Sequence, residues 1–315
     1  MRAAATVLLL RELEGELEVL MMRRGAGLAF MADMWVFPGG RIDVADASAA
    51  ARARVAPEAL ASCCGQLHSL HGERLADDDA IALHVAACRE TFEEAGVLLA
   101  RDRAGRPCSP DRVAALQPLR GEIERDGGRF IALLEAEDLY VDIGPLVYWS
   151  HWITPSIEPK RYDTRFFAIP VPPDQAVSAD LSELTEHAWV KPALAHAAIE
   201  RGEIRVVAPT LLTLEDLAES HARHGGLEAM LVAERGRPTP PVMPRIEVCP
   251  DEVRIVMPWD AGYATTPGEG CTPAGEFPAH LLRRDSCVKM ARDRTARQKS
   301  EGPGHHVPGP RDPAA

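Results

Sequence analysis

A cluster of three glutamates constrains this chain more than any other feature. The segment Arg89–Val97 reads Arg-Glu-Thr-Phe-Glu-Glu-Ala-Gly-Val, which puts Glu90, Glu93 and Glu94 at positions i, i+3 and i+4. Residues three and four apart share one face of an α-helix, where like charges repel each other. Hard cations such as Mg²⁺ take oxygen ligands and are commonly shared with substrate phosphates. The spacing therefore predicts a helix whose acidic face holds a divalent cation.

A tight turn lies upstream of this helix. Phe37-Pro38-Gly39-Gly40 follows the apolar residues Met34-Trp35-Val36. A Pro-Gly-Gly segment lets the backbone turn sharply and approach a ligand closely. Because hard cations also accept carbonyl oxygens, the backbone of Gly39 or Gly40 is a further candidate metal ligand.

Together the two segments resemble the box of the Nudix hydrolase family. That box reads Gly, five residues, Glu, seven residues, Arg-Glu, an apolar residue, any residue, Glu-Glu, any residue, Gly and an apolar residue. Gly40 takes the first position, and Asp46 stands where the family has Glu. The second half matches at Arg89, Glu90, Glu93, Glu94, Gly96 and Val97, with Thr91 in the apolar position. An acidic pair alone usually marks a solvated surface, but two ordered halves around a turn are far more specific.

An insert interrupts the box. Asp46 and Arg89 are 43 positions apart where the family pattern needs 8, so 35 extra residues separate the halves. The insert, about 47–80, begins Ala-rich and predicts a helix that Pro57 ends or restarts. Asp77–Asp79 offers an N-cap for the box helix, and Gly96 its C-cap. The insert begins and ends beside the predicted metal-binding helix, so we hypothesise that it forms a lid over the site.

Two downstream segments narrow the resemblance. They read His-Trp-Ile-Thr-Pro at 151–155 and Lys-Arg-Tyr-Asp-Thr-Arg-Phe-Phe at 160–167. With the split box, they look like the Nudix branch that includes the peroxisomal acyl-CoA diphosphatases of animals and many bacterial relatives. The resemblance covers most of the first 235 residues. It implies an α/β (α+β) fold, namely a Nudix α/β/α sandwich with a mixed sheet, a helical insert and a C-terminal extension.

The resemblance also implies an activity. It is the metal-dependent hydrolysis, with Mg²⁺ or Mn²⁺, of a phosphoanhydride in a nucleoside-diphosphate-linked substrate. The branch points to CoA or acyl-CoA, giving 3′,5′-ADP and (acyl-)4′-phosphopantetheine. Two alternatives stay open: a pyrophosphatase for NADH or ADP-ribose, and a catalytically silent module that binds a nucleotide and regulates a partner. The intact glutamates argue against the silent module.

The box residues receive distinct expected roles. The expected catalytic residues are Glu90, Arg89 and Glu93, and the expected metal ligands are Glu90, Glu93, Glu94 and Gly40. Glu90 is a candidate ligand and a candidate general base. Arg89 is expected to orient the glutamates, because it can pair with Glu93 at i+4 and with Asp46. Asp43 is placed either to reach the metal or to serve as a turn residue.

Residues outside the box are weaker candidates. Phosphate binding is assigned to Arg23, Arg24 and Arg161, with Lys160 as a fourth candidate, since the guanidinium fork matches phosphate oxygens; each is individually more often a surface residue. Trp152 and Tyr162 could stack on a base, although strand aromatics are more often core residues. Glu183 and Glu186 could supply a base from a loop. His187 and His305-His306 show no convincing ligand spacing.

Composition limits the partners. A net charge of −12 argues against nonspecific binding to nucleic acid, because a polyanion would be repelled. The seven cysteines form no paired motif and indicate reduced thiols in a cytoplasm-like compartment. The chain ends in Asp-Pro-Ala-Ala rather than the peroxisomal Ser-Lys-Leu, and no apolar stretch reaches membrane-spanning length. A nucleotide-type small molecule is the expected partner, and a homodimer stays open.

The chain divides into three expected regions. Residues 1–240 form the Nudix domain, 241–281 an extension that packs on it, and 282–315, which are polar and rich in Pro and Gly, a disordered tail. Within the domain, the pattern predicts a β-hairpin turning at Glu14-Gly15, a helix over 129–139, and a helical segment over 209–234 that breaks at Gly225-Gly226.

Overall fold

The computed structural model describes residues 1–27, 31–63, 65–172, 174–178, 184–249, 252–271, 277 and 288–291. Its centre is an eight-stranded sheet in the order β10-β7-β8-β1-β2-β3, with β4 paired to β1 and β9 to β2. The strands are β1 (Arg2–Leu13), β2 (Glu16–Arg24), β3 (Trp35–Val36), β4 (Gly39–Arg41), β7 (Val147–Ile153), β8 (Tyr162–Pro170), β9 (Leu184–Val190) and β10 (Pro241–Val242). β1 runs parallel to β8 and antiparallel to β2 and β4, so the sheet is mixed.

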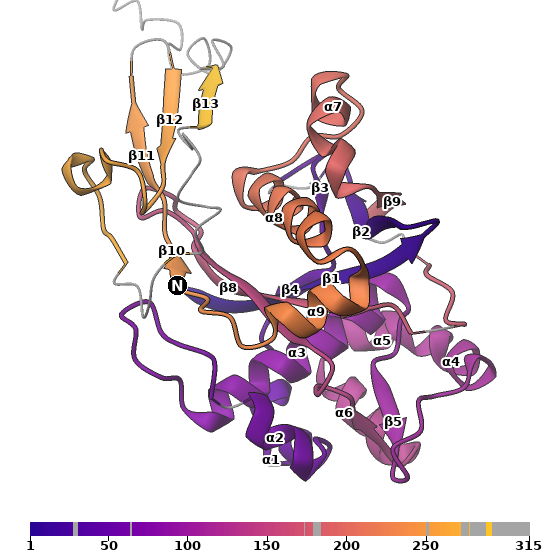
Figure 1. Cartoon of the computed structure of the whole chain (residues 1–315). Helices are drawn as coiled ribbons and strands as arrows, with labels where there is room; N and C mark the ends of the chain where they lie inside the picture. The colour runs from indigo at the N-terminus through magenta and orange to yellow at the C-terminus, as the bar shows by residue number, and fades with distance from the viewer. Residues whose placement is uncertain are drawn as a thin grey trace, which may run out of the picture.

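The central strand β1 is buried on both faces. Ala5, Val7 and Leu9 enter one hydrophobic core, and Leu8 and Leu10 enter the other, as the two-residue period of a strand requires. Figure 1 shows helices on either side of the sheet. The first core is covered by α3 (Asp77–Ala95), and the second by α8 (Ala208–His224) and α9 (Leu227–Glu234). The predicted α/β/α sandwich with a mixed sheet is confirmed.

Helix α3 carries the second half of the box. Its apolar face from Ile81 to Cys88 is buried in the first core, as the sequence predicts. Gly96 caps the C-terminus with a φ of 69°, a left-handed conformation that costs glycine little. The predicted N-cap was wrong: the cap is Ala76, and its side chain makes no cap hydrogen bond. Asp77–Asp79 occupy the first turn instead, where negative charge complements the helix dipole.

The insert forms two short helices, α1 (Ala49–Ala53) and α2 (Pro57–Cys63), and Pro57 starts the second one. It lies against a two-stranded ribbon of β5 (Ala100–Asp102) and β6 (Leu139–Val141). There the Val141 amide donates to the Arg54 carbonyl at 2.8 Å. On the sheet side, Arg165 of β8 donates to the carbonyl of His68 at 2.6 Å. The lid hypothesis stays a prediction.

Several predicted boundaries can be compared with the structure. The hairpin turns at Glu14-Gly15, and α8 and α9 are separated at Gly225-Gly226, so both predictions are confirmed. The helix predicted over 129–139 is shorter: α6 spans Gly128–Ala136. Asp138 has a φ of 47°, which a continuing helix cannot accommodate, and β6 begins at Leu139. The remaining helices are α4 (Pro110–Leu116), α5 (Arg120–Arg125) and α7 (Ala195–Glu200), with short 3₁₀ helices η1 (Val44–Ala47), η2 (Gln117–Leu119), η3 (Pro192–Leu194) and η4 (Tyr263–Thr265).

The C-terminal part adds a small antiparallel sheet of β11 (Arg245–Val248), β12 (Glu252–Val256) and β13 (Val288–Ala291). It projects from the body of the molecule (Figure 1). Around its base, Met257 and Trp259 pack on the second core. Strand β13 falls inside the segment that the sequence predicts to be disordered, and the rest of 282–315 lies outside the described residues. Among the residues described, no helix combines the length and apolarity needed to cross a membrane.

Candidate active site

The two halves of the box meet at β4 and α3. The Gly39 amide donates to Oε2 of Glu94 at 2.8 Å. A Cβ at Gly40 would lie 2.3 Å from Oε1 of Glu90, and a Cβ at Gly39 would lie 2.4 Å from the carbonyl oxygen of Ala5. Only glycine permits such an approach of backbone to carboxylate and to the neighbouring strand. The predicted juxtaposition of the turn with the acidic helix is confirmed.

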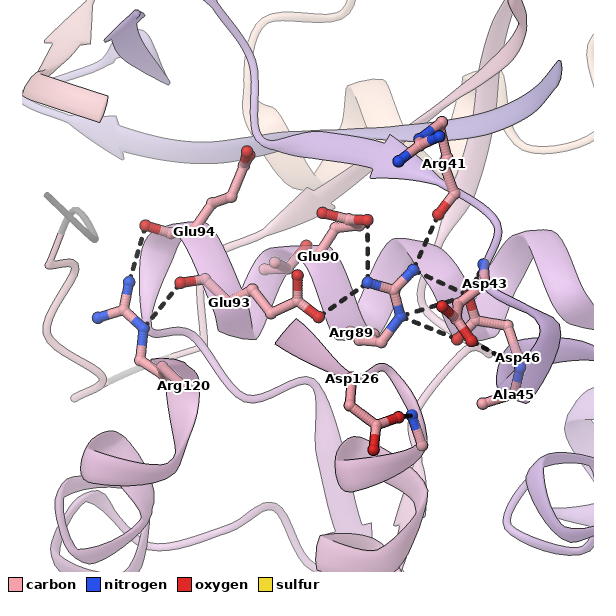
Figure 2. Close-up of polar contacts among 12 residues, drawn as sticks. Arg41, Asp43, Ala45, Asp46, Arg89, Glu90, Glu93, Glu94, Arg120 and Asp126 are labelled. Atoms are coloured by element: carbon pink, nitrogen blue, oxygen red, sulfur yellow. Dashed lines mark hydrogen bonds and ion pairs between the residues drawn. The ribbon is translucent and has the colours of Figure 1, made fainter. Parts of the chain in front are cut away.

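The Arg89 guanidinium stands at the centre of the acidic cluster (Figure 2). It donates to Asp46 at 2.9 Å, to Glu90 at 2.9 Å and to Glu93 at 2.8 Å, and also to the carbonyl of Arg41 at 2.9 Å. Arg89 is only 4% exposed and Asp46 is fully buried. The predicted pairs of Arg89 with Glu93 and with Asp46 are confirmed. The shorter Asp46 therefore reaches the arginine across the 35-residue insert.

The short helix η1 explains how Asp46 arrives there. The Asp43 side chain accepts from the Ala45 amide at 2.8 Å, and the Asp43 amide donates to Asp46 at 2.8 Å. This reciprocal capping box turns the chain just after β4. Of the two readings of Asp43, the structure places it as the turn residue.

Burial and neighbouring charges shift the pKa values of the residues in the acidic cluster. Burial raises the pKa of Glu90 to about 7, against the attraction of Arg89. Burial also raises the pKa of Glu93, and it raises the pKa of Glu94 well above its usual value with help from the Glu90 charge. Burial disfavours the charged form of Arg89, yet its bond to Asp46 and the nearby carboxylates raise its pKa. Arg89 thus donates to three carboxylates, those of Asp46, Glu90 and Glu93, while Glu94 lies beside Glu90, so carboxylates outnumber the guanidinium in this cluster.

The donor set suits a hard divalent cation. Three carboxylates and nearby backbone carbonyls are oxygen donors of the kind Mg²⁺ prefers, and the surplus negative charge is what a cation would offset. Within the described ranges, no three His, Cys, Asp or Glu side chains already converge as a metal-binding group. Figure 2 shows Glu90 and Glu93 with their carboxylate oxygens turned to Arg89. The Glu94 carboxylate instead accepts from the Gly39 amide. The ligand assignment stays a prediction.

The predicted phosphate-binding arginines separate in space. The charge of Arg24, at the end of β2, acts on the Glu94 carboxylate and opposes the rise of its pKa. Neighbouring Arg23 forms ion pairs with Asp33 at 2.5 Å and with Glu186 at 3.4 Å. Arg24 is therefore the candidate that the fold brings to the acidic helix.

Arg161 has a different setting. Its guanidinium pairs with Glu269 at 2.9 Å and donates to Sδ of Met243 at 3.2 Å, both in the C-terminal part of the chain. Its Nε donates to the carbonyl of Thr154 at 3.2 Å. Arg161, directly before β8, therefore links the main sheet to the C-terminal extension.

The remaining candidate residues outside the box can be compared with the structure. Trp152 is buried in the second core, which favours the core reading over base stacking. Glu186 is paired with Arg23, and His187 is an exposed residue of β9. Glu183 and His305-His306 lie outside the described residues.

Arg120 is a site residue that the sequence analysis does not predict. From the first turn of α5, its guanidinium donates to the carbonyls of Glu93 at 2.9 Å and Glu94 at 2.8 Å. It is also only 7% exposed. Arg120 lies in a segment without a motif, 27 residues beyond Glu93. Only the folded arrangement of α3 and α5 reveals the contact.

Comparison with known families decides the class. The family model described as the NUDT19 Nudix domain matches residues 1–217. This chain is a Nudix hydrolase. Hydrolases of this family generally need divalent metal ions, which agrees with the oxygen donors gathered at α3.

Two vertebrate relatives carry the same printed name, acyl-coenzyme A diphosphatase NUDT19. This Nudix hydrolase is 27% identical to the protein of Xenopus laevis over 276 residues, 79% of the chain and 72% of the frog protein. It is 30% identical to the Homo sapiens protein over 226 residues, 64% of the chain and 60% of the human protein. The match thus leaves out more than a third of the human sequence.

A solved structure is also similar. The NUDIX hydrolase from Alicyclobacillus acidocaldarius is 28% identical with a TM-score of 0.56, covering 76% of this chain and 98% of that one. The match supports the Nudix fold over most of the chain.

Proposed function

We propose that this Nudix hydrolase cleaves the diphosphate of CoA or acyl-CoA and releases 3′,5′-ADP and (acyl-)4′-phosphopantetheine. The observation that carries the substrate class is the match of residues 1–217 to the NUDT19 Nudix domain. Two relatives named acyl-coenzyme A diphosphatase support it. The chemistry of the box supports hydrolysis of a diphosphate but does not by itself choose the nucleotide.

The proposed metal is Mg²⁺ or Mn²⁺, held by Glu90, Glu93, Glu94 and the carbonyl of Gly40. Such an ion, when bound, neutralises diphosphate charge and lowers the pKa of water. Arg89 holds the carboxylates of Glu90 and Glu93 in fixed orientations through bonds of 2.9 and 2.8 Å. The Gly39 amide does the same for Glu94 at 2.8 Å.

Glu90 is our candidate for the general base. Burial raises the pKa of this carboxyl to about 7, close to the pH at which a base both accepts a proton and exists unprotonated. Arg24 is our first candidate to bind substrate phosphate, with Arg23 and Arg161 as further candidates. The fork of an arginine can contact two phosphate oxygens at once.

The proposal also covers the setting of the enzyme. Cys88, Cys108, Cys249 and Cys271 are free thiols, which supports a reducing compartment, and we propose the cytoplasm. A homodimer is a further expectation, which light scattering of the purified chain would decide. The proposed partner is a nucleotide-type small molecule rather than a nucleic acid.

A substrate panel tests the proposal. The protein is incubated with Mg²⁺ and with CoA, acyl-CoA, NADH, ADP-ribose and nucleoside triphosphates, and products are separated by chromatography. We expect CoA or its esters to give the highest kcat/KM. If NADH or ADP-ribose is preferred, the substrate class is wrong while the hydrolase assignment survives. If no substrate turns over, the silent nucleotide-binding module becomes the better interpretation.

A pair of variants tests the site. Glu93→Gln keeps the size of the side chain but removes a charged ligand, so kcat should fall by two or more orders of magnitude. Glu122→Gln, an exposed glutamate of α5, is the matched control and should behave as wild type. Wild-type turnover in Glu93→Gln would contradict the metal assignment.

A further inference from the structure

Arg120 makes an unusual set of contacts for a buried arginine. Its guanidinium donates to four oxygens on two other segments of the chain. Two are the backbone carbonyls of Glu93 and Glu94, at 2.9 and 2.8 Å. Two belong to Ser178, its hydroxyl and its carbonyl, each at 2.9 Å. Gln117, in the turn before α5, accepts a fifth and longer bond at 3.2 Å.

The two helical acceptors lie in the last turn of α3. Carbonyls there have no partner within the helix and carry its partial negative charge. A guanidinium satisfies them and stabilises the helix end. The C-cap residue Gly96 is also closely surrounded. Gln117 donates to its carbonyl at 2.7 Å, and a Cβ on Gly96 would lie 3.0 Å from Arg120 Nη1.

The other two acceptors belong to the segment 174–178, which precedes β9. The Ser178 amide donates to the carbonyl of Ala95 at 3.0 Å. Gln175 closes a second pair of bonds with Leu98, at 2.9 Å to its amide and 3.1 Å to its carbonyl. Arg120 therefore joins α5, the end of α3 and this segment in one hydrogen-bonded unit.

Glu93 and Glu94 are held both by their backbone carbonyls and by their side chains. Their carbonyls are held by Arg120 at the C-terminal end of the helix (Figure 2). Their carboxylates are bonded to Arg89 and to the Gly39 amide, respectively. Any unwinding of the last turn of α3 would move the Glu93 carboxylate away from Arg89 and the Glu94 carboxylate away from Gly39.

We propose that Arg120 is a positioning residue for metal binding. It fixes the last turn of α3 and thereby the directions of the Glu93 and Glu94 carboxylates, without contacting metal or substrate itself. This inference rests on the proposed function, because it takes Glu93 and Glu94 as metal ligands. The planar fork matters more than the charge, since a lysine ammonium cannot reach four acceptors in two directions.

Mn²⁺ binding to the full chain without substrate tests the proposal. Arg120→Met should raise the Kd for Mn²⁺, measured by electron paramagnetic resonance, about tenfold, and Arg120→Lys nearly as much. In the activity assay, kcat at fixed Mg²⁺ should fall with KM for substrate little changed. Added guanidinium should partly restore Mn²⁺ affinity to Arg120→Ala.

Arg112→Met is the matched control. Arg112 is a partly buried arginine of α4 whose guanidinium donates to the side chain and carbonyl of Glu137, at the end of α6. Its loss should lower thermal stability without changing the Kd for Mn²⁺. If Arg120→Met is folded and binds Mn²⁺ as tightly as wild type, the proposal is wrong.

Two further measurements distinguish failure of this proposal from misfolding of a variant and from failure of the proposed function. If Arg120→Met does not fold, Ser178→Ala, which removes one acceptor of Arg120, should still raise the Kd about two- to threefold, and an unchanged Kd would reject the proposal. Glu93→Gln separates this inference from the proposed function. If Glu93→Gln binds Mn²⁺ as tightly as wild type, the ligand assignment is wrong. If Glu93→Gln binds Mn²⁺ more weakly but Arg120→Met binds it normally, only the role of Arg120 is wrong.

Discussion

Replacing Arg89 with methionine should destabilise the protein strongly. The guanidinium donates to three buried carboxylates and to the Arg41 carbonyl. Methionine fills much of the volume but leaves those carboxylates without their cation. Removing one partner of a buried ion pair typically costs about 3–5 kcal/mol. We expect a loss in that range, measured as the free energy of urea unfolding at pH 7.5 with EDTA.

Two comparisons check the reasoning. Arg54→Met removes an exposed pair with Asp138, 3.2 Å long, and should cost about 0–1 kcal/mol. The double variant Asp46→Asn/Arg89→Met should be more stable than the sum of the single effects predicts, by about 1–3 kcal/mol, because the two residues share one network.

The pH dependence gives a third check. In Arg89→Met the carboxylates of Glu90 and Glu93 lose their nearby positive charge, so their folded-state pKa values, already raised by burial, rise further above the unfolded ones. Protonation then relieves the folded state as the pH falls, and the deficit against wild type should be smaller at pH 5.5 than at pH 7.5. A deficit below about 1 kcal/mol, additive single effects or a deficit that grows at pH 5.5 would refute the electrostatic account.

Two further predictions concern single positions. Gly40→Ala puts a Cβ 2.3 Å from the Glu90 carboxylate, so kcat should fall at least tenfold, while Gly121→Ala, with open space around it, should leave kcat unchanged. Burial lowers the pKa of His84 to about 4 from 6.5, so the unfolded state binds the extra proton and stability falls as the pH drops below about 6.5. His84→Gln should remove about 2 kcal/mol of the loss between pH 7 and 5, and an unchanged slope in urea unfolding would contradict this.

The sequence predicted the acidic face of α3 and its meeting with Gly40 because both depend on short, ordered spacings. Helical periodicity places the three glutamates together, and only glycine allows the turn to approach Glu90. The partnership of Asp46 with Arg89 came from the family pattern rather than from local rules, since spacing alone says nothing about residues 43 positions apart.

Other parts of the site depend on tertiary packing. Arg161 was a reasonable phosphate-binding candidate by chemistry, yet its partners Met243 and Glu269 come from an extension whose path no local pattern specifies. Arg120 was missed for the same reason, because its acceptors are backbone carbonyls that carry no sequence signature. The end of α6 was misplaced because the left-handed Asp138 interrupts an otherwise helical pattern.

The interrupted box has a consequence for how much chain the fold can accommodate at this point. The entropy lost on closing a loop grows only with the logarithm of its length, by about 0.6 kcal/mol for each doubling. Extending the connection between Asp46 and Arg89 from 8 to 43 positions is a little more than two doublings, or about 1.5 kcal/mol. That increment is smaller than the roughly 3–5 kcal/mol typically lost when one partner of a buried ion pair such as Arg89–Asp46 is removed. Additional residues between η1 and α3 would therefore cost little loop-closure entropy while Asp46 still reaches Arg89.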